Sequence, residues 1–306
     1  MSARLRVTAL PVALAALTAA IVAPLGAQTP AEPASPVEGS HRRIETLLVD
    51  AANAMAAVYD YRGIILKREL FGDELVEQKI AFKFSRPFRV YVKYLDPHEG
   101  REGLYVRGRN RNRLRAHRGS PPDITANLNP RGRIAMIDNH HPITSFGLEN
   151  MLKIATRNIE KAIARGDATL TISNGGLIRG EPTWRIDMET NAGGFTVKAR
   201  RGETLWDIAR RTKQDMHVIL HHNEGIESPD DVSAGQDVFI PHYYASRGVY
   251  FFSQRTYMLI LTVSWDHRGQ LYEWYEYPDL ELNPRLDDRD FDHRNEAYEF
   301  VKVNQR

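Results

Sequence analysis

The sequence predicts an α+β fold: one large curved antiparallel sheet with helices, interrupted by a small βααβ unit. Three observations support this prediction. Most of the chain repeats short alternating apolar stretches separated by turns, as antiparallel strands with one buried face do. Two longer stretches have the apolar spacing of helices. The segment 194–244 follows neither pattern, and strands resume after it, so we expect an inserted domain.

The first residues, 1–27, have the order of a secretory signal peptide. Two arginines precede an almost wholly apolar stretch, residues 7–25, and small residues follow it. A membrane-spanning helix is the alternative, but two prolines and the small-residue end favour cleavage. Residues 28–40 are rich in Pro, Ala and Ser and predict a disordered linker. We therefore expect an exported protein of the periplasm or cell wall, without a membrane span after signal removal.

Composition excludes several classes of site. The sequence contains no cysteine, which excludes a disulfide, a thiolate metal site and a lipid-anchored cysteine after the signal. Its formal net charge is +2, so composition offers no case for nucleic acid as a partner. About 280 mature residues are enough for one sizeable core and a small additional module.

The host domain, residues 41–193 and 245–306, is predicted to contain two helices and a series of strands. The helices cover about His41–Tyr59 and Leu148–Ala164, the second capped by Thr144 or Ser145. Strands are predicted at Ile64–Leu66, Ile80–Phe84, Arg89–Leu95, Tyr105–Val106, Ala168–Ile172, Thr183–Met188, Tyr257–Trp265 and Leu271–Tyr277. Because short turns join consecutive strands, we expect antiparallel pairing in one sheet.

The inserted segment is predicted to fold as strand, helix, helix and strand. A strand at 195–199 is followed by two short helices and a second strand at 237–240. Thr204 caps the first helix, with Asp207 completing a short capping box, and Asn223 suits the end of the second.

The insert resembles the LysM family from end to end. The resemblance is carried by Gly-Glu-Thr-Leu-Trp-Asp-Ile-Ala at 202–209, by Asn223, and by Gly-Gln-x-Val-x-Ile-Pro at 235–241. It implies a shallow groove for peptidoglycan or another glycan that contains N-acetylglucosamine. Carried onto this sequence, the groove residues are Gly202, Glu203, Thr204, Leu205, Gly225, Ile226, Glu227, Ser228 and Pro229. Packing of the insert on its host could cover this groove, and that alternative stays open.

The host domain resembles the bacterial domain of unknown function 1571, over most of 41–190 and 245–300. The matching stretches are 86–97, 100–108, 128–130, 135–136, 141–150, 275–284 and 290–292. This family is thought to be similar in shape to LolA-type lipoprotein carriers. The resemblance therefore implies an incomplete barrel whose apolar concave face, covered by helices, can shelter an acyl chain of a lipid or lipoprotein. Family members usually lack the LysM insert.

The alternation of side chains along predicted strands identifies two further sets of candidate residues. The residues predicted to line the concave face are Phe82, Phe84, Tyr91, Leu95, Tyr105 and Trp184, and an ordinary packed core is the alternative. A basic hairpin supplies alternate arginines that would project from one face of a ribbon and could hold lipid phosphates or wall acids. They are Arg107, Arg109, Arg111, Arg113 and Arg115, for which a solvated face is the alternative.

No motif in the sequence predicts a metal site, a cofactor or a catalytic residue. His217 and His221 have the spacing of metal ligands, but Val218 occupies the position where the zinc motif requires Glu. Asp288, Asp290, Asp292 and Glu299 imitate a calcium loop that lacks its glycine. His140 and His141 precede a proline, where a structural role is expected. Carboxylate pairs brought together by folding stay open.

We therefore predict a non-enzymatic envelope protein that binds glycan through its insert and a lipid or lipoprotein through its sheet. Two alternatives remain: a peptidoglycan-modifying enzyme that the insert positions, and an envelope sensor or structural factor that binds a protein partner. The absence of a nucleophile or metal motif favours the binding hypotheses over the enzyme.

Overall fold

The computed structural model describes residues 40–191 and 193–300. The signal-peptide prediction lies outside these residues, and so does the linker prediction except for Ser40, which begins the first helix. Among the described helices, none is long and apolar enough to cross a membrane.

The host domain consists of two long helices and the strands of one sheet. Its first part contains α1 (Ser40–Ala56), β1 (Asp60–Phe71), β2 (Glu74–Ser85), β3 (Arg89–Asp96), β4 (Glu102–Val106), β5 (Leu114–His117), β6 (Thr125–Leu128) and α2 (Leu148–Arg165). Its second part contains β7 (Ala168–Ile178), β8 (Glu181–Thr190), β11 (Arg247–Ser253), β12 (Leu259–Trp265), β13 (Leu271–Glu276) and β14 (Glu281–Leu282). Short 3₁₀ turns lie at Asn110–Asn112, Ile143–Ser145 and Asp288–Phe291.

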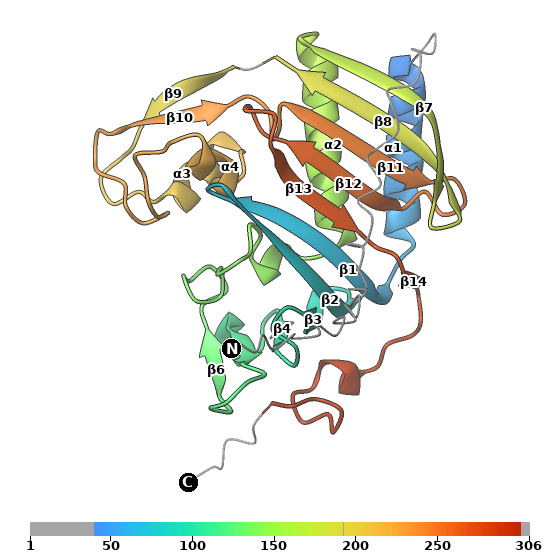
Figure 1. Ribbon diagram of the computed structural model, residues 1–306, viewed down its shortest axis with the longest axis vertical. Helices are drawn as coiled ribbons and strands as arrows, with labels where there is room; N and C mark the ends of the chain where they lie inside the picture. Colours follow the sequence, from blue (N-terminus) through green and yellow to red (C-terminus); the bar gives the residue numbers. More distant parts are fainter. Residues whose placement is uncertain (1–39, 192, 301–306) are drawn as a thin grey trace, which may run out of the picture. The chain divides into compact units, whose positions relative to one another are not determined.

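The strands of the host pair in a single antiparallel sheet, as predicted. Their order is β6-β5-β4-β3-β2-β1-β13-β12-β11-β8-β7, with β14 beside β1 (Figure 1). The pairing of β1 with β13 joins the strands before the insert to those after it, so that Lys67 lies opposite Tyr275 and Glu69 opposite Glu273. Side chains that are distant in sequence thereby meet on one face of the sheet.

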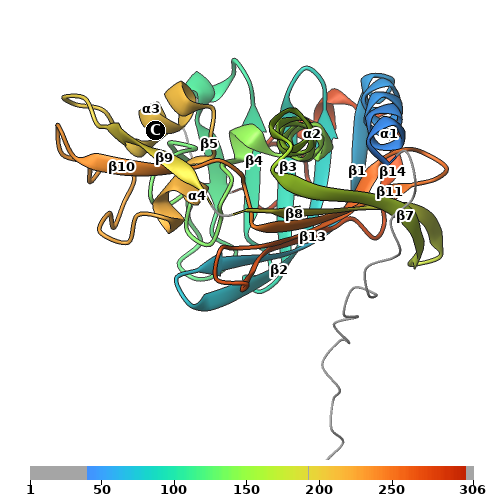
Figure 2. The same cartoon turned by 90° about the horizontal axis from the view of Figure 1, so that it is seen from above.

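Helices α1 and α2 lie on the same face of the sheet, against the half formed by β7, β8 and β11–β13 (Figure 2). Apolar side chains from both helices and from the strands beneath them form the main core. Ile44 of α1, Ile159 of α2 and Ile186 of β8 are fully buried in it. The 3.6-residue spacing that predicted the helices thus corresponds to their buried stripes.

The predicted cap of α2 is wrong. The helix begins after Gly147, whose φ of 111° lies in the region that favours glycine. The hydroxyl oxygen of Tyr61 accepts a hydrogen bond from the Leu148 N–H (3.0 Å), which satisfies one free donor of the first turn. A Cβ atom on Gly147 would lie 2.3 Å from that hydroxyl oxygen. A tertiary contact therefore caps α2 in place of Thr144 or Ser145.

Strands β5, β6 and β11 were not identified individually from the sequence. The first two are only four residues long. In β11, Tyr250 and Phe252 face the helices, while Val249 and Phe251 pack on the opposite face of the sheet. Since both faces are buried, the strand lacks the alternation that identifies a half-exposed one.

The insert contains β9 (Gly194–Lys198), α3 (Leu205–Thr212), α4 (Met216–His221) and β10 (Asp237–Pro241). Strands β9 and β10 pair only with each other, and a separate apolar cluster fills the space between them and the helices. The predicted capping box of Thr204 and Asp207 is present. Asn223 bonds both backbone groups of Phe239, which ties the end of α4 to β10.

The insert occupies a hairpin connection. The strands on either side of it, β8 and β11, are antiparallel neighbours, and the Thr190 N–H donates to the Ser246 carbonyl at 2.8 Å. Both ends of the insert are therefore fixed where these two neighbouring strands meet.

Candidate ligand cavity

A cavity of about 440 Å³ lies on the inner face of the sheet, beside the helix-covered core. Strands β1–β6 form its floor, with Ile65, Ile80 and Val92 among the lining side chains, and the loop 129–147 covers it. Most of its wall is apolar. A space of this size exceeds ordinary packing defects and falls in the range of ligand pockets.

The covering segments expose large apolar side chains beside the cavity. Ile134 is 69% exposed, Ile137 is 49% exposed and Ile124 is 47% exposed, and all three also line the cavity. Isoleucine is usually buried, so three exposed isoleucines around one opening form an apolar rim that can contact an apolar partner.

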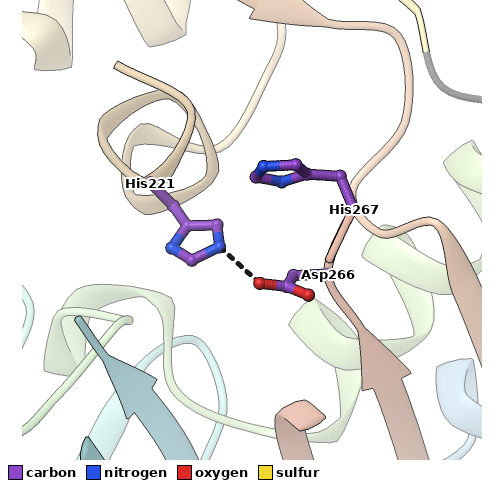
Figure 3. Close-up of side chains that lie close together, drawn as sticks. All are labelled: His221, Asp266 and His267. Carbon is purple, nitrogen blue, oxygen red and sulfur yellow. Dashed lines mark hydrogen bonds and ion pairs between the residues drawn. The ribbon is translucent and has the colours of Figure 1, made fainter. Parts of the chain in front are cut away.

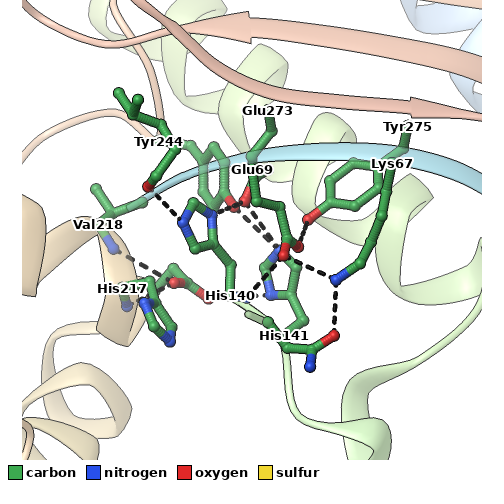
Figure 4. Close-up of polar contacts among 12 residues, drawn as sticks. Lys67, Glu69, His140, His141, His217, Val218, Tyr244, Glu273 and Tyr275 are labelled. Atoms are coloured by element: carbon green, nitrogen blue, oxygen red, sulfur yellow. Dashed lines mark hydrogen bonds and ion pairs between the residues drawn. The ribbon is translucent and has the colours of Figure 1, made fainter. Parts of the chain in front are cut away.

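One end of the cavity is polar. Lys67 and Glu69 reach it from β1 and Tyr275 from β13 (Figure 4). Asn139 of the covering loop also lines it. Lys67 Nζ donates to Glu69 Oε2 at 2.8 Å and to Asn139 Oδ1 at 2.6 Å. The Tyr275 hydroxyl donates to the other oxygen of Glu69. Burial opposes ionisation of Glu69, but the charges of Lys67 and His140 outweigh it and lower the pKa.

Behind this end, Glu273 binds two histidines. Its Oε1 lies 2.7 Å from His140 Nδ1 and 3.5 Å from His141 Nε2, and it accepts a hydrogen bond from the Tyr244 hydroxyl. Burial alone would raise the pKa of Glu273, but the hydrogen bonds and charges of these histidines hold it well below its usual range. The carboxylate is therefore ionised at neutral pH.

His140 has the geometry of an imidazolium. Its Nδ1 faces the Glu273 carboxylate, and its Nε2 lies 2.9 Å from the Leu70 carbonyl, which can only accept. Both ring nitrogens therefore carry a proton. Burial lowers the pKa of His141, but the hydrogen bond to Glu273 and its negative charge outweigh burial and raise the pKa to about 9. The buried carboxylates thus face buried cations.

Helix α4 of the insert packs against this network. His141 Nδ1 lies 3.6 Å from Asp215 Oδ2, and Asp215 also caps α4 by accepting the N–H groups of His217 and Val218. The His217 ring stacks on His140 with centroids 4.9 Å apart. Burial, followed by the positive charge of His140, holds the pKa of His217 well below its usual range. Neutral His217 therefore lies against charged His140.

Glu69, His140 and Glu273 place donor atoms close enough to hold a metal ion. Each of these donors already has a protein partner: Glu69 has Lys67 and Tyr275, and both nitrogens of His140 are in use. These charged groups therefore have their hydrogen-bond partners within the protein, and the network fixes the covering loop to the sheet.

The predicted glycan-binding loops lie next to each other. The Leu205 N–H donates to the Pro229 carbonyl at 2.8 Å, which joins the loop after β9 to the loop after α4. Leu205 and Ile226 are buried in the insert core, and the Glu203 carboxylate binds Arg211 through both oxygens. Gly202, Gly225, Glu227 and Ser228 are exposed. Backbone groups and these exposed positions are thus what the loops offer to a ligand.

The prediction of the cavity lining is wrong at all six positions. Phe82 and Phe84 face inward but are covered by other core aromatics, among them Phe146 and Tyr61. Tyr91 points to the outer face, where it stacks on Tyr298. The residues that line the cavity on β3 are instead Val92 and Tyr94. Leu95, Tyr105 and Trp184 do not line it either.

The predicted ribbon of arginines is also not formed. Asn110, Arg111 and Asn112 have positive φ values and make a tight turn, so β5 begins only at Leu114. Of the five arginines, Arg107 lies over the ring of Phe88, and Arg113 donates to the Asn127 carbonyl. Arg109 and Arg111 are exposed, and Arg115 is half-buried within β5. They therefore do not share one face of a ribbon.

Comparison with known proteins relates the chain to a family without a known function. The model of the protein family of unknown function DUF1571 matches residues 58–222, which is more than half of the chain. No curated protein matches the sequence.

Several solved structures are similar to the chain at low sequence identity. A LolA superfamily protein from Nitrosomonas europaea is 10% identical over 81% of this chain and 96% of that chain, with a TM-score of 0.29. The Mycobacterium tuberculosis lipoprotein LppX is 12% identical over 79% and 98%, with a TM-score of 0.35. In the MucA/MucB complex of Pseudomonas aeruginosa, the matched chain is 10% identical over 82% and 60%, with a TM-score of 0.39.

Proposed function

We propose that this chain, which belongs to the DUF1571 family, is an exported, non-enzymatic protein of the cell envelope that shelters an acyl chain of a lipid or lipoprotein. The apolar cavity of about 440 Å³ is the observation that carries this proposal. Leaving such a space empty forfeits the packing contacts of its walls, whereas an acyl chain would restore them.

The rim of the cavity suits the apolar part of a lipid. The exposed Ile134 and Ile137 at its rim can contact a membrane surface or the acyl chain as it enters. The polar groups that also line the cavity, Lys67 and Tyr275, direct their donors to protein acceptors on Glu69, Asp138 and Asn139. The wall therefore favours a long apolar ligand.

Mass spectrometry of organic extracts from the purified mature chain tests the proposal. We expect a lipid in the wild-type extract and its loss from an Ala116→Phe variant, because Ala116 lines the cavity and a phenyl ring there would occupy part of the space that the lipid needs. Leu177→Phe on β7 is a matched control, since Leu177 is 69% exposed and lies outside the cavity. Equal lipid in the wild type and Ala116→Phe would reject the cavity as the binding site.

For the insert, we propose binding to the N-acetylglucosamine-containing glycan of peptidoglycan. Support comes from the LysM-like motif and from the contact between its two loops at Leu205 and Pro229. The hydrogen bonds that hold Glu203 and Thr204 stay within the insert. Helix α4 of the insert packs on the host through Val218.

Retention on purified sacculi tests the glycan proposal. A Gly225→Trp variant should reduce retention, because Gly225 is exposed and a Cβ atom there meets nothing within 4 Å, so the indole would occupy the groove without disturbing the fold. Leu177→Trp adds the same side chain to β7, outside the insert, and this variant should be retained like the wild type. Retention that is unchanged by Gly225→Trp would place any sugar contact elsewhere.

The enzymatic alternative can be separated by product analysis. Its candidate acid–base groups would be Glu69, Glu273 and the two neighbouring histidines, yet each of these is hydrogen bonded to protein partners. We expect no new fragments when the chain is incubated with purified peptidoglycan. Fragments whose release is lost in Glu69→Gln would replace the carrier proposal with a hydrolase.

A further inference from the structure

A second histidine cluster lies where the insert meets the far end of the host sheet. His221 is the last residue of α4, and Asp266 and His267 begin the turn between β12 and β13 (Figure 3). His221 Nε2 lies 2.9 Å from Asp266 Oδ2. One donor atom from each of the three side chains can be chosen so that all lie within 4.8 Å of one another.

The Asp266 carboxylate is held in place by the turn that contains it. Its Oδ1 accepts the backbone N–H groups of Arg268 (2.9 Å) and Gln270 (2.8 Å). This leaves Oδ2 directed at His221. Ordered metal sites commonly have ligands whose second atom is fixed in this way by the surrounding protein.

Asp266 is also a buried carboxylate with little compensating charge. Its side chain is 1% exposed, and within residues 40–191 and 193–300 its ion-pair partner is His221. The neighbouring Arg268 directs its guanidinium to Glu224 instead. Buried carboxylates are normally paired with a cation or coordinate a metal, and a divalent ion beside Oδ2 would supply the missing positive charge.

A third histidine lies next to the cluster. His222 Nδ1 donates to the Val218 carbonyl at 2.9 Å, so in the neutral ring Nε2 keeps its lone pair. Its ring centroid lies 4.4 Å from that of His267. Three imidazoles and one carboxylate are thereby gathered from two parts of the chain that are 45 residues apart in sequence.

We propose that His221, Asp266 and His267 bind one divalent transition-metal ion, Zn²⁺ by the chemistry of the ligands. Imidazole nitrogen and carboxylate oxygen are established zinc ligands, and bonds of about 2.0–2.2 Å place tetrahedral donors about 3.3 Å apart. The pair of His221 and Asp266 is already near that spacing. His267 is exposed, so its ring can rotate to close the site, and the fourth position is open to water or His222.

The ion would join two separate parts of the protein. His221 belongs to the insert, whereas Asp266 and His267 belong to the host sheet, so the metal would hold α4 against the β12–β13 turn. The metal would add to the contacts that α4 already makes with the host through Val218, Asp215 and His217. The proposal is independent of lipid and glycan binding.

The test is a Zn²⁺ titration of the full mature chain, freed of any purification tag and treated with chelator, followed by calorimetry. We expect one equivalent to bind and the thermal midpoint to rise with added metal. Co²⁺ should give the visible absorption of a tetrahedral nitrogen–oxygen site. His267→Ala should weaken binding at least about 100-fold, because it removes a direct ligand from an exposed position without opening the core.

His41→Ala is the matched control, since His41 is an exposed histidine on α1, and it should bind like the wild type. Circular dichroism will show whether each variant is folded. Failure of the folded wild type to bind Zn²⁺ at micromolar concentration would overturn the proposal. Equal binding by His267→Ala and His41→Ala would also overturn it, because the metal would then lie at other residues.

Discussion

The two halves of the sheet are covered in different ways. The half formed by β7, β8 and β11–β13 lies under α1 and α2, and its inner face is filled by side chains such as Ile159 and Ile186 that are wholly buried. Strands β1–β3 also contribute side chains such as Phe82 and Phe84 to this core, but elsewhere β1–β6 lie under the loop 129–147, with a cavity of about 440 Å³ between them. One continuous sheet therefore carries both a close-packed core and an unfilled space.

This difference separates what stabilises the protein from what is available for binding. A helix presents a dense apolar stripe at regular spacing, so two helices can fill the space above a sheet. An irregular loop must find hydrogen-bond partners for its backbone N–H and C=O groups, and it cannot offer the same density of apolar side chains. Lys67, His140 and Glu273 hold the loop in place by charge, and the apolar space beside them stays open.

The largest loss of stability is expected from truncating one isoleucine in each half. Ile186→Ala should lower the free energy of unfolding by about 4 kcal/mol, because it opens a cavity in a filled core. Ile80→Ala should cost about 2 kcal/mol, since Ile80, although buried in the core, also forms part of the cavity wall, where its side chain has no protein neighbour on one side. Urea unfolding of the two variants measures both values. Equal losses would mean that the two halves are packed alike.

Enlarging a side chain should give a contrast in the same direction. Ala155→Phe on α2 should destabilise the chain by about 3 kcal/mol, because Ala155 is 1% exposed within the packed core. Ala116→Phe should change stability by less than about 1 kcal/mol, because the ring can enter the cavity. Thermal unfolding compares the pair. A large loss in Ala116→Phe would show that the cavity is too small to accept a ring.

The charge network at the end of the cavity should make stability fall at alkaline pH. The pKa of His141 is raised to about 9, above its value of about 6.5 in the unfolded chain. Its contribution is therefore complete below pH 6.5 and is lost as the pH rises through 9. We expect a loss on the order of 2–3 kcal/mol between these values, measured by urea unfolding.

A His141→Gln variant tests the source of this slope. Glutamine does not titrate, so the variant should be less stable at pH 6.5 and should lose less stability up to pH 9 than the wild type, with the raised pKa of His140 accounting for the slope that remains. A slope equal to that of the wild type would assign the alkaline loss to groups other than His141.

The smallest effect on stability is expected at the rim. Ile134→Ser should change the free energy of unfolding by about 0.5 kcal/mol or less, because Ile134 is 69% exposed. The same change should slow the transfer of a fluorescent fatty acid between the protein and vesicles, which can be followed by stopped-flow fluorescence. An unchanged transfer rate would exclude Ile134 from the entry path.

Local patterns in the sequence predicted much of the fold. Helical spacing located α1 and α2, and alternation located β1–β4, β7, β8, β12 and β13, because one buried face imposes these periods on the chain. The patterns failed where tertiary contacts decide the structure. The cap of α2 depends on Tyr61 from β1, and β11 is buried on both of its faces.

The candidate site was harder to predict. Alternation assigns a face but does not show what covers it, so Phe82 was placed in the cavity although Phe146 and Tyr277 cover it. The partners of His140 are 71 and 133 residues away, and no local pattern connects them. The one sequence feature that pointed to this buried charge network was the pair His140 and His141 before Pro142. A pair of histidines in a loop has many explanations.

We propose above all that the half of the sheet formed by β1–β6 binds an acyl chain in its cavity. Titration of the delipidated mature chain with an environment-sensitive fluorescent fatty acid tests it most directly. We predict saturable binding of one ligand per chain to the wild type, and at least a tenfold weaker signal with folded Ala116→Phe. Absence of saturable binding to the wild type, or equal binding to Ala116→Phe, would contradict the account.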